Sequence, residues 1–123
     1  MNWHNKVFVF DDIVDLETQN KIKDLMLNKA MWSFVSDVTN PNLNDQQRPG
    51  FAHWFVQDEI IKSDLHDEVL PIIKNSLKNL DVQGDRRYLQ GRSFLQLPLN
   101  IDNREKLDVP HIDIADFKHL VIL

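Results

Sequence analysis

The stretch Val109–Leu123, VPHIDIADFKHLVIL, places a histidine and an aspartate two residues apart behind a proline. Side chains two residues apart in a β-strand point to the same face, so His111 and Asp113 can direct an imidazole and a carboxylate at one point. Pro110 favours an extended backbone here. Imidazole and carboxylate are the ligand types of non-haem Fe(II), which binds two histidines and one carboxylate. The spacing therefore permits a metal site.

The same spacing also arises by chance. With 5 histidines and 15 aspartates among 123 residues, random placement yields about 0.6 His-x-Asp pairs. His66 and Glu68 share the spacing but fall in a predicted helix, where two residues rotate by about 200° and point apart. On spacing alone, a polar pair beside a turn on a solvated strand edge is the better explanation of His111 and Asp113.

Composition limits the class of protein. The length of 123 residues and the apolar content of 42% predict one domain, residues 1–123, with a hydrophobic core. A net charge of −5 argues against a general nucleic-acid binder. No apolar run approaches the ~20 residues of a membrane span, and no signal peptide is recognisable. The absence of cysteine excludes disulfides and thiolate metal sites. We therefore expect a cytoplasmic protein without membrane association.

Periodicity predicts a mixed fold. The pattern favours strands at 6–13, 31–38 and 51–57, helices at 16–30 and 64–80, an extended segment at 86–100, and two strands in the final stretch. Asp15 and Ser63 are placed to cap the two helices. Pro71 lies inside the second helical pattern, which predicts a kink or a later start. The order of elements favours an α+β fold with helices packed on one side of a sheet.

The quoted stretch also resembles a known family. PHIDIADFKHLVIL is similar to the metal-binding strand and the following strand of the 2-oxoglutarate and Fe(II)-dependent oxygenases, in their prolyl-4-hydroxylase-like branch from bacteria and phages. FVFDDIVD, MWSF, DEVLPIIKNSL and RYLQGRSFLQLPL resemble the elements that precede that strand. The likeness extends over nearly the whole chain, although His-x-Asp is its only sharp motif. It implies N-terminal helices packed on a partial double-stranded β-helix, or jelly-roll, sheet.

The resemblance assigns roles to residues. It implies that His111 is the first imidazole ligand and Asp113 the carboxylate ligand of Fe(II), with 2-oxoglutarate as the second cofactor. The family's third ligand is a histidine much further along the chain, followed by a basic residue for 2-oxoglutarate. The sequence ends ten residues after Asp113, and His119 lies too close to replace that ligand. We therefore expect a truncated N-terminal part of a dioxygenase, with the C-terminal strands missing and no activity in isolation.

Tyr88 and Arg92, which precede the motif in the chain, are candidates for binding the co-substrate. Tyr88 and Arg92 lie in the extended segment, and arginine binds carboxylates through two parallel hydrogen bonds. Either residue could line a pocket for an anionic co-substrate. The alternative is a solvated strand face that offsets the acidic surface. His53, beside Trp54 in a predicted strand, is expected to be a hydrogen-bonded polar neighbour rather than a ligand.

A second class of function stays open. Leu120–Leu123 is an apolar, strand-forming run without charge, proline or glycine. An exposed strand of this kind favours pairing with another chain, so we expect a homo-oligomer formed through the C-terminal strand. The alternative to an oxygenase is therefore a non-catalytic oligomerising or binding module with a half-barrel fold. The sequence does not indicate a substrate.

Overall fold

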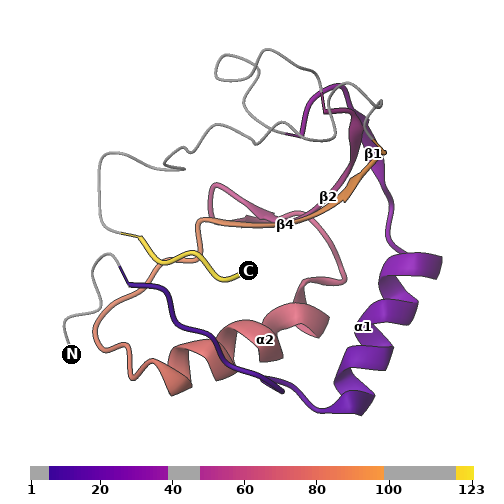
Figure 1. The fold of residues 1–123 in the computed structure, drawn as a ribbon. Helices are drawn as coiled ribbons and strands as arrows, with labels where there is room; N and C mark the ends of the chain where they lie inside the picture. Colours follow the sequence, from indigo (N-terminus) through magenta and orange to yellow (C-terminus); the bar gives the residue numbers. More distant parts are fainter. Residues whose placement is uncertain (1–5, 39–47, 99–118) are drawn as a thin grey trace.

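A computed structural model describes residues 6–38, 48–98 and 119–123 (Figure 1). In these ranges the elements follow the order α1 (Leu16–Asn28), β1 (Ser33–Val35), β2 (Gly50–Gln57), β3 (Ile60–Ile61), α2 (His66–Asn79) and β4 (Gln90–Gln96). The described residues thus form two helices and a four-stranded antiparallel sheet. The expected α+β class is confirmed.

The sheet is organised around β2. Strand β4 pairs along one edge of β2, and β1 and β3 pair at the two ends of its other edge, all antiparallel. The register with β4 shifts between Trp54 and Val56, which leaves Phe55 as an extra residue in β2. Such a bulge changes which side chains reach a given face. Phe55 and Val56 are consecutive and both buried, with 4% and 2% of their surface exposed, so they contribute to the core together.

Helix α1 begins where the sequence predicts. The carboxylate of Asp15 accepts a hydrogen bond from the backbone N–H of Thr18 at 2.7 Å and caps the first turn. After the helix, the indole Nε1 of Trp32 donates to the carbonyl of Met26 at 3.0 Å. This bond ties the connection between α1 and β1 back onto the helix. In Figure 1, α1 and α2 lie on the same side of the strands, as expected.

Helix α2 begins two residues later than predicted, at His66. Ser63 does not cap its first turn, because the Ser63 hydroxyl accepts the N–H of Leu65, one residue before the helix, at 3.0 Å. Pro71 lies inside the helix and has no N–H to offer the carbonyl of Asp67. The apolar residues at helical spacing along α2 and at its two ends are buried or half-buried, namely Leu65, Val69, Ile72, Ile73, Leu77 and Leu80.

Two predicted strands are absent from the described residues. Residues 6–13 form no strand, and Val7 and Val9 are 92% and 82% exposed. Residues 119–123 form no strand either, and Val121 is 51% exposed. Both predictions were wrong for the same reason. β-Branched and aromatic residues favour extended backbone, but a strand also needs a hydrogen-bonded neighbour, which the segment's own sequence does not supply.

A hydrogen bond ties the N-terminal segment to helix α2, and two of the segment's rings contact each other. The side-chain amide of Asn75 in α2 donates to the carbonyl of Ile13 at 2.8 Å. The rings of Phe8 and Phe10 stack with centroids 6.5 Å apart.

Within the described residues, neither helix is long and apolar enough to cross a membrane.

Candidate functional site

The predicted metal ligands fall outside the described residues. His111 and Asp113 belong to the range 99–118, so their prediction as ligands stays a prediction. In the ranges that the structure describes, no group of three or more histidines and carboxylates lies close enough together to hold a metal ion. The candidate site is therefore built from the described residues of the sheet and its connections.

Tyr88 and Arg92, the predicted co-substrate residues, lie on opposite faces of β4. A Cβ added to Gly91 would lie 1.9 Å from the Tyr88 hydroxyl, so Tyr88 covers the face toward which a side chain at position 91 would point. Consecutive residues of a strand point to opposite faces, so Arg92 points the other way. The structure does not bring these two predicted residues together at one point.

Tyr88 packs toward helix α2. Its ring lies 5.8 Å from the imidazole of His66, the first residue of the helix, measured between centroids. Burial raises the pKa of the Tyr88 phenol above its ordinary value. The imidazole Nδ1 of His66 lies 2.9 Å from the Asp67 carboxylate. Tyr88 therefore takes part in the packing between β4 and α2.

Arg92 contacts two aromatic rings on the other face of the sheet. It lies opposite Trp54 in the antiparallel register, and its guanidinium carbon is 5.1 Å from the centre of the indole ring. The same carbon is 4.7 Å from the ring centre of Phe94, two residues further along β4. Both distances fall within the range of cation–π attraction. These three residues, Trp54, Arg92 and Phe94, are called the arginine–aromatic cluster below.

Arg87 is engaged differently from Arg92. Its Nε and Nη2 donate to the two carboxylate oxygens of Glu59, which follows β2 in the turn toward β3. These hydrogen bonds lower the pKa of the Glu59 carboxyl and raise that of the Arg87 guanidinium. Arg87 thus ties the segment before β4 to the hairpin, and its guanidinium fork is already occupied.

His53 forms a buried polar connection whose partners the sequence did not reveal. Only 7% of its surface is exposed, and its Nδ1 lies 3.0 Å from the carbonyl oxygen of Met31. A carbonyl only accepts, so Nδ1 carries the proton and Nε2 accepts from the Ser63 hydroxyl at 2.9 Å. The expectation that His53 is a hydrogen-bonded polar neighbour is confirmed. Its partners could not be predicted, because Met31 and Ser63 are distant in sequence.

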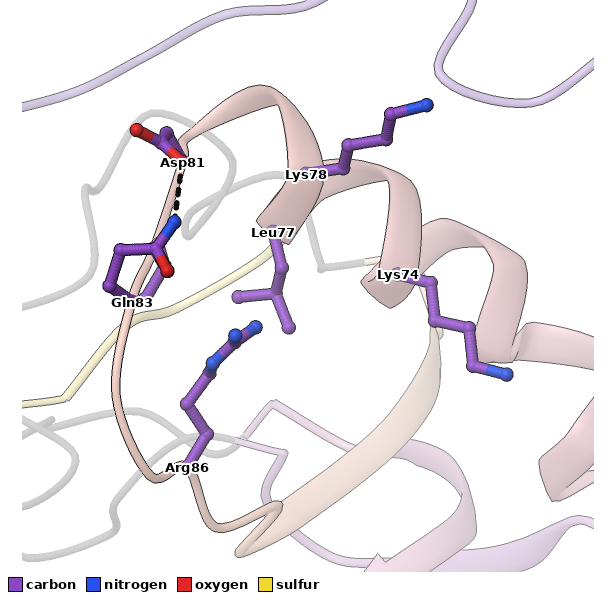
Figure 2. A pocket seen from close by; sticks show the side chains of 7 residues that line it. Lys74, Leu77, Lys78, Asp81, Gln83 and Arg86 are labelled. Atoms are coloured by element: carbon purple, nitrogen blue, oxygen red, sulfur yellow. Dashed lines mark hydrogen bonds between the residues drawn. The ribbon is translucent and has the colours of Figure 1, made fainter.

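A shallow hollow lies beside the C-terminal end of α2. Its volume is about 370 Å³, and it is lined by Lys74, Leu77, Lys78, Asp81, Val82, Gln83 and Arg86. Figure 2 shows Leu77 and Arg86 pointing into the hollow, whereas the Lys74 and Lys78 side chains extend away from it. Gln83 donates to the Asp81 carboxylate at 2.6 Å. Three cations line this hollow, but they do not converge on one point.

Comparisons with known proteins assign no family to this chain. No family model, no curated protein and no solved structure matches it. The described residues define an α+β protein with an open antiparallel sheet. The functional argument therefore rests on the chain's own residues.

Proposed function

We propose that this chain forms the N-terminal part of a 2-oxoglutarate and Fe(II)-dependent dioxygenase of the prolyl-4-hydroxylase-like branch. The observation that carries the proposal is the pair His111 and Asp113, which follows strand β4 in a sequence that resembles the metal-binding strand of that family. The sheet would then be one part of a double-stranded β-helix.

Two features of the fold support this proposal. The order of helix, strands, helix and strand puts the seven-residue strand β4 directly before the segment that carries the motif. Both helices lie on one side of the sheet (Figure 1). Arg92 points away from the face that Tyr88 and α2 cover, so the arginine–aromatic cluster lies on the other side. A supporting helical layer behind one sheet is the arrangement that the resemblance implies.

The donor types fit iron, and their number predicts weak binding. A neutral imidazole from His111 and an ionised carboxylate from Asp113 suit Fe(II). The third ligand and the base for 2-oxoglutarate would come from outside these 123 residues. The bound iron would supply oxygen activation, and this chain would hold two of its coordination positions. Arg92 would be available to the co-substrate, whereas Tyr88 faces α2.

Calorimetric titration with Mn(II), as a surrogate for Fe(II), tests the number of ligands. Two protein ligands predict weak binding or no detectable heat. Stoichiometric submicromolar binding that disappears in His111→Ala would contradict this count, because it would require a further ligand within the chain.

A second proposal, self-association, is favoured by the exposed apolar side chains. Phe34 and Leu95 both lie opposite Phe51 in the sheet register and are 62% and 52% exposed, and Val121 is 51% exposed. Exposed apolar side chains that lie next to one another mark interaction surfaces. We expect a dimer or a larger assembly, measured by size-exclusion chromatography with light scattering. A monomer at every concentration, unchanged when Val121 and Leu123 are both replaced by lysine, would contradict it.

A further inference from the structure

The sheet carries a single formal charge. The four described strands have the sequences SFV, GFAHWFVQ, II and QGRSFLQ. Among their residues, Arg92 is the only one with a formal charge at neutral pH, counting Asp, Glu, Lys and Arg. The whole chain contains 19 acidic residues, but none of them lies in a strand that the structure describes. The Arg92 guanidinium therefore has no counter-charge within the sheet.

The two aromatic rings hold this guanidinium in place. Trp54 on β2 and Phe94 on β4 both contact it, at 5.1 Å and 4.7 Å between the guanidinium carbon and the ring centres. Contact with ring faces restricts the side chain but uses none of its N–H donors. A guanidinium held in this way can still bind a carboxylate in its own plane through two parallel hydrogen bonds.

Nearby arginines do not share this combination. Arg87 donates to both oxygens of Glu59, and the Nε of Arg86 donates to the carbonyl of Gly84 at 3.3 Å. In the described part of the chain, no carboxylate is bonded to Arg92, whose side chain is exposed. An exposed guanidinium that two rings hold in place, and to which no carboxylate of the described residues is bonded, is suited to a ligand.

We propose that the arginine–aromatic cluster binds the carboxylate of an organic acid. Arg92 accepts the carboxylate through its N–H fork, while the carbon skeleton of the acid lies against the exposed part of the Phe94 ring, which is 42% exposed. The cluster needs no metal ion for this contact. The proposal therefore holds whether or not His111 and Asp113 bind iron.

The test is an NMR titration in buffer that contains a metal chelator. The ligands are 2-oxoglutarate, phenylacetate and inorganic phosphate at constant ionic strength. We expect saturable shifts of the Arg92 Nε–H and Trp54 indole N–H signals with at least one of the two organic acids. Saturation by 2-oxoglutarate alone would identify the co-substrate as the ligand, and saturation by phenylacetate would identify an acid with an apolar body.

Matched variants locate the binding. Arg92→Gln should raise Kd about tenfold or more, because a charge-assisted pair of hydrogen bonds is lost. Arg86→Gln removes the same charge from the hollow beside α2 and should leave Kd within about twofold. Arg92→Lys keeps the charge and loses the fork, so it should bind several-fold more weakly and provides the same test if Arg92→Gln does not fold.

Three outcomes would overturn the proposal. The first is the absence of saturable shifts at Arg92 and Trp54 in the wild-type chain. The second is tighter binding of phosphate than of either organic acid. The third is loss of binding in Arg86→Gln but not in Arg92→Gln, which would place the anion in the hollow. Because the titration contains a metal chelator, failure of this proposal is distinguishable from failure of the proposed metal site.

Discussion

The imidazole of His53 and the hydroxyl of Ser63 lie 2.9 Å apart and join the central strand β2 to the connection between β3 and α2. Met31, in the connection between α1 and β1, completes this buried group: its carbonyl oxygen lies 3.0 Å from Nδ1 of the His53 ring. One histidine therefore links three parts of the chain that are distant in sequence. The Ser63 hydroxyl also accepts the N–H of Leu65, so it serves two partners.

Replacement of Ser63 by alanine should lower the free energy of unfolding by about 1–3 kcal/mol, because it leaves His53 Nε2 and the Leu65 N–H without their partner. Chemical denaturation measures the effect. Ser36→Ala is the matched control, since Ser36 is exposed, and it should stay within about 0.5 kcal/mol of the wild type. Equal effects of the two substitutions would show that the His53–Ser63 bond contributes nothing measurable.

The side chain of Tyr88 occupies the space that a Cβ at position 91 would need. Alanine normally stabilises a strand relative to glycine, but a Cβ at position 91 would lie 1.9 Å from the Tyr88 hydroxyl. Gly91→Ala should therefore destabilise the chain by about 1–3 kcal/mol through overpacking. In a Tyr88→Leu background the same substitution should cost much less, because the obstructing ring is gone. The idea fails if Gly91→Ala has the same effect in both backgrounds.

The Glu59–Arg87 pair should make stability depend on pH. Hydrogen bonding to Arg87 lowers the pKa of Glu59 below its ordinary value of 4.5 in the folded chain. A group whose folded-state pKa is depressed stabilises the fold above its unfolded pKa, and this contribution disappears as the pH falls through the folded pKa. Denaturation between neutral and acidic pH should thus show a shallower loss of stability below 4.5 for Glu59→Gln than for the wild type. Arg87→Gln should show the same shallower loss, and wild-type steepness in both variants would contradict the assignment.

The isolated chain should not decarboxylate 2-oxoglutarate. The proposed site would supply two metal ligands and not the distal base of the family, so the iron and the co-substrate would be poorly held. Succinate formation should not exceed that of a control with buffer and iron alone. Succinate formation above this control that disappears in Asp113→Ala would overturn the prediction.

The sequence predicted those parts of the fold that depend on neighbours along the chain. The Asp15 cap, the strand from Gly50 to Gln57 and the apolar spacing along α2 all follow from local pattern, and the structure contains them. Residues 6–13 and 119–123 have strand-like composition but form no strand, because pairing depends on distant residues.

The contacts of the candidate site depend on long-range pairing as well. Arg92 was predicted as a candidate ligand-binding residue, but its contact with Trp54 requires the register between β2 and β4. That register shifts at Phe55, and no feature of the local sequence marks the shift. The bonds from Arg87 to Glu59 and from His53 to Ser63 likewise join segments that only the folded chain brings together.

The most direct test of the proposed metal site is NMR with substoichiometric Mn(II), because paramagnetic broadening detects weak binding and reports its location. The proposal predicts selective broadening of the amide signals around His111 and Asp113, abolished in His111→Ala. It also predicts that His66→Ala leaves this broadening unchanged, since His66 and Glu68 share the spacing but lie on helix α2. Broadening that is absent from the 111–113 region, or that survives in His111→Ala, would contradict the account.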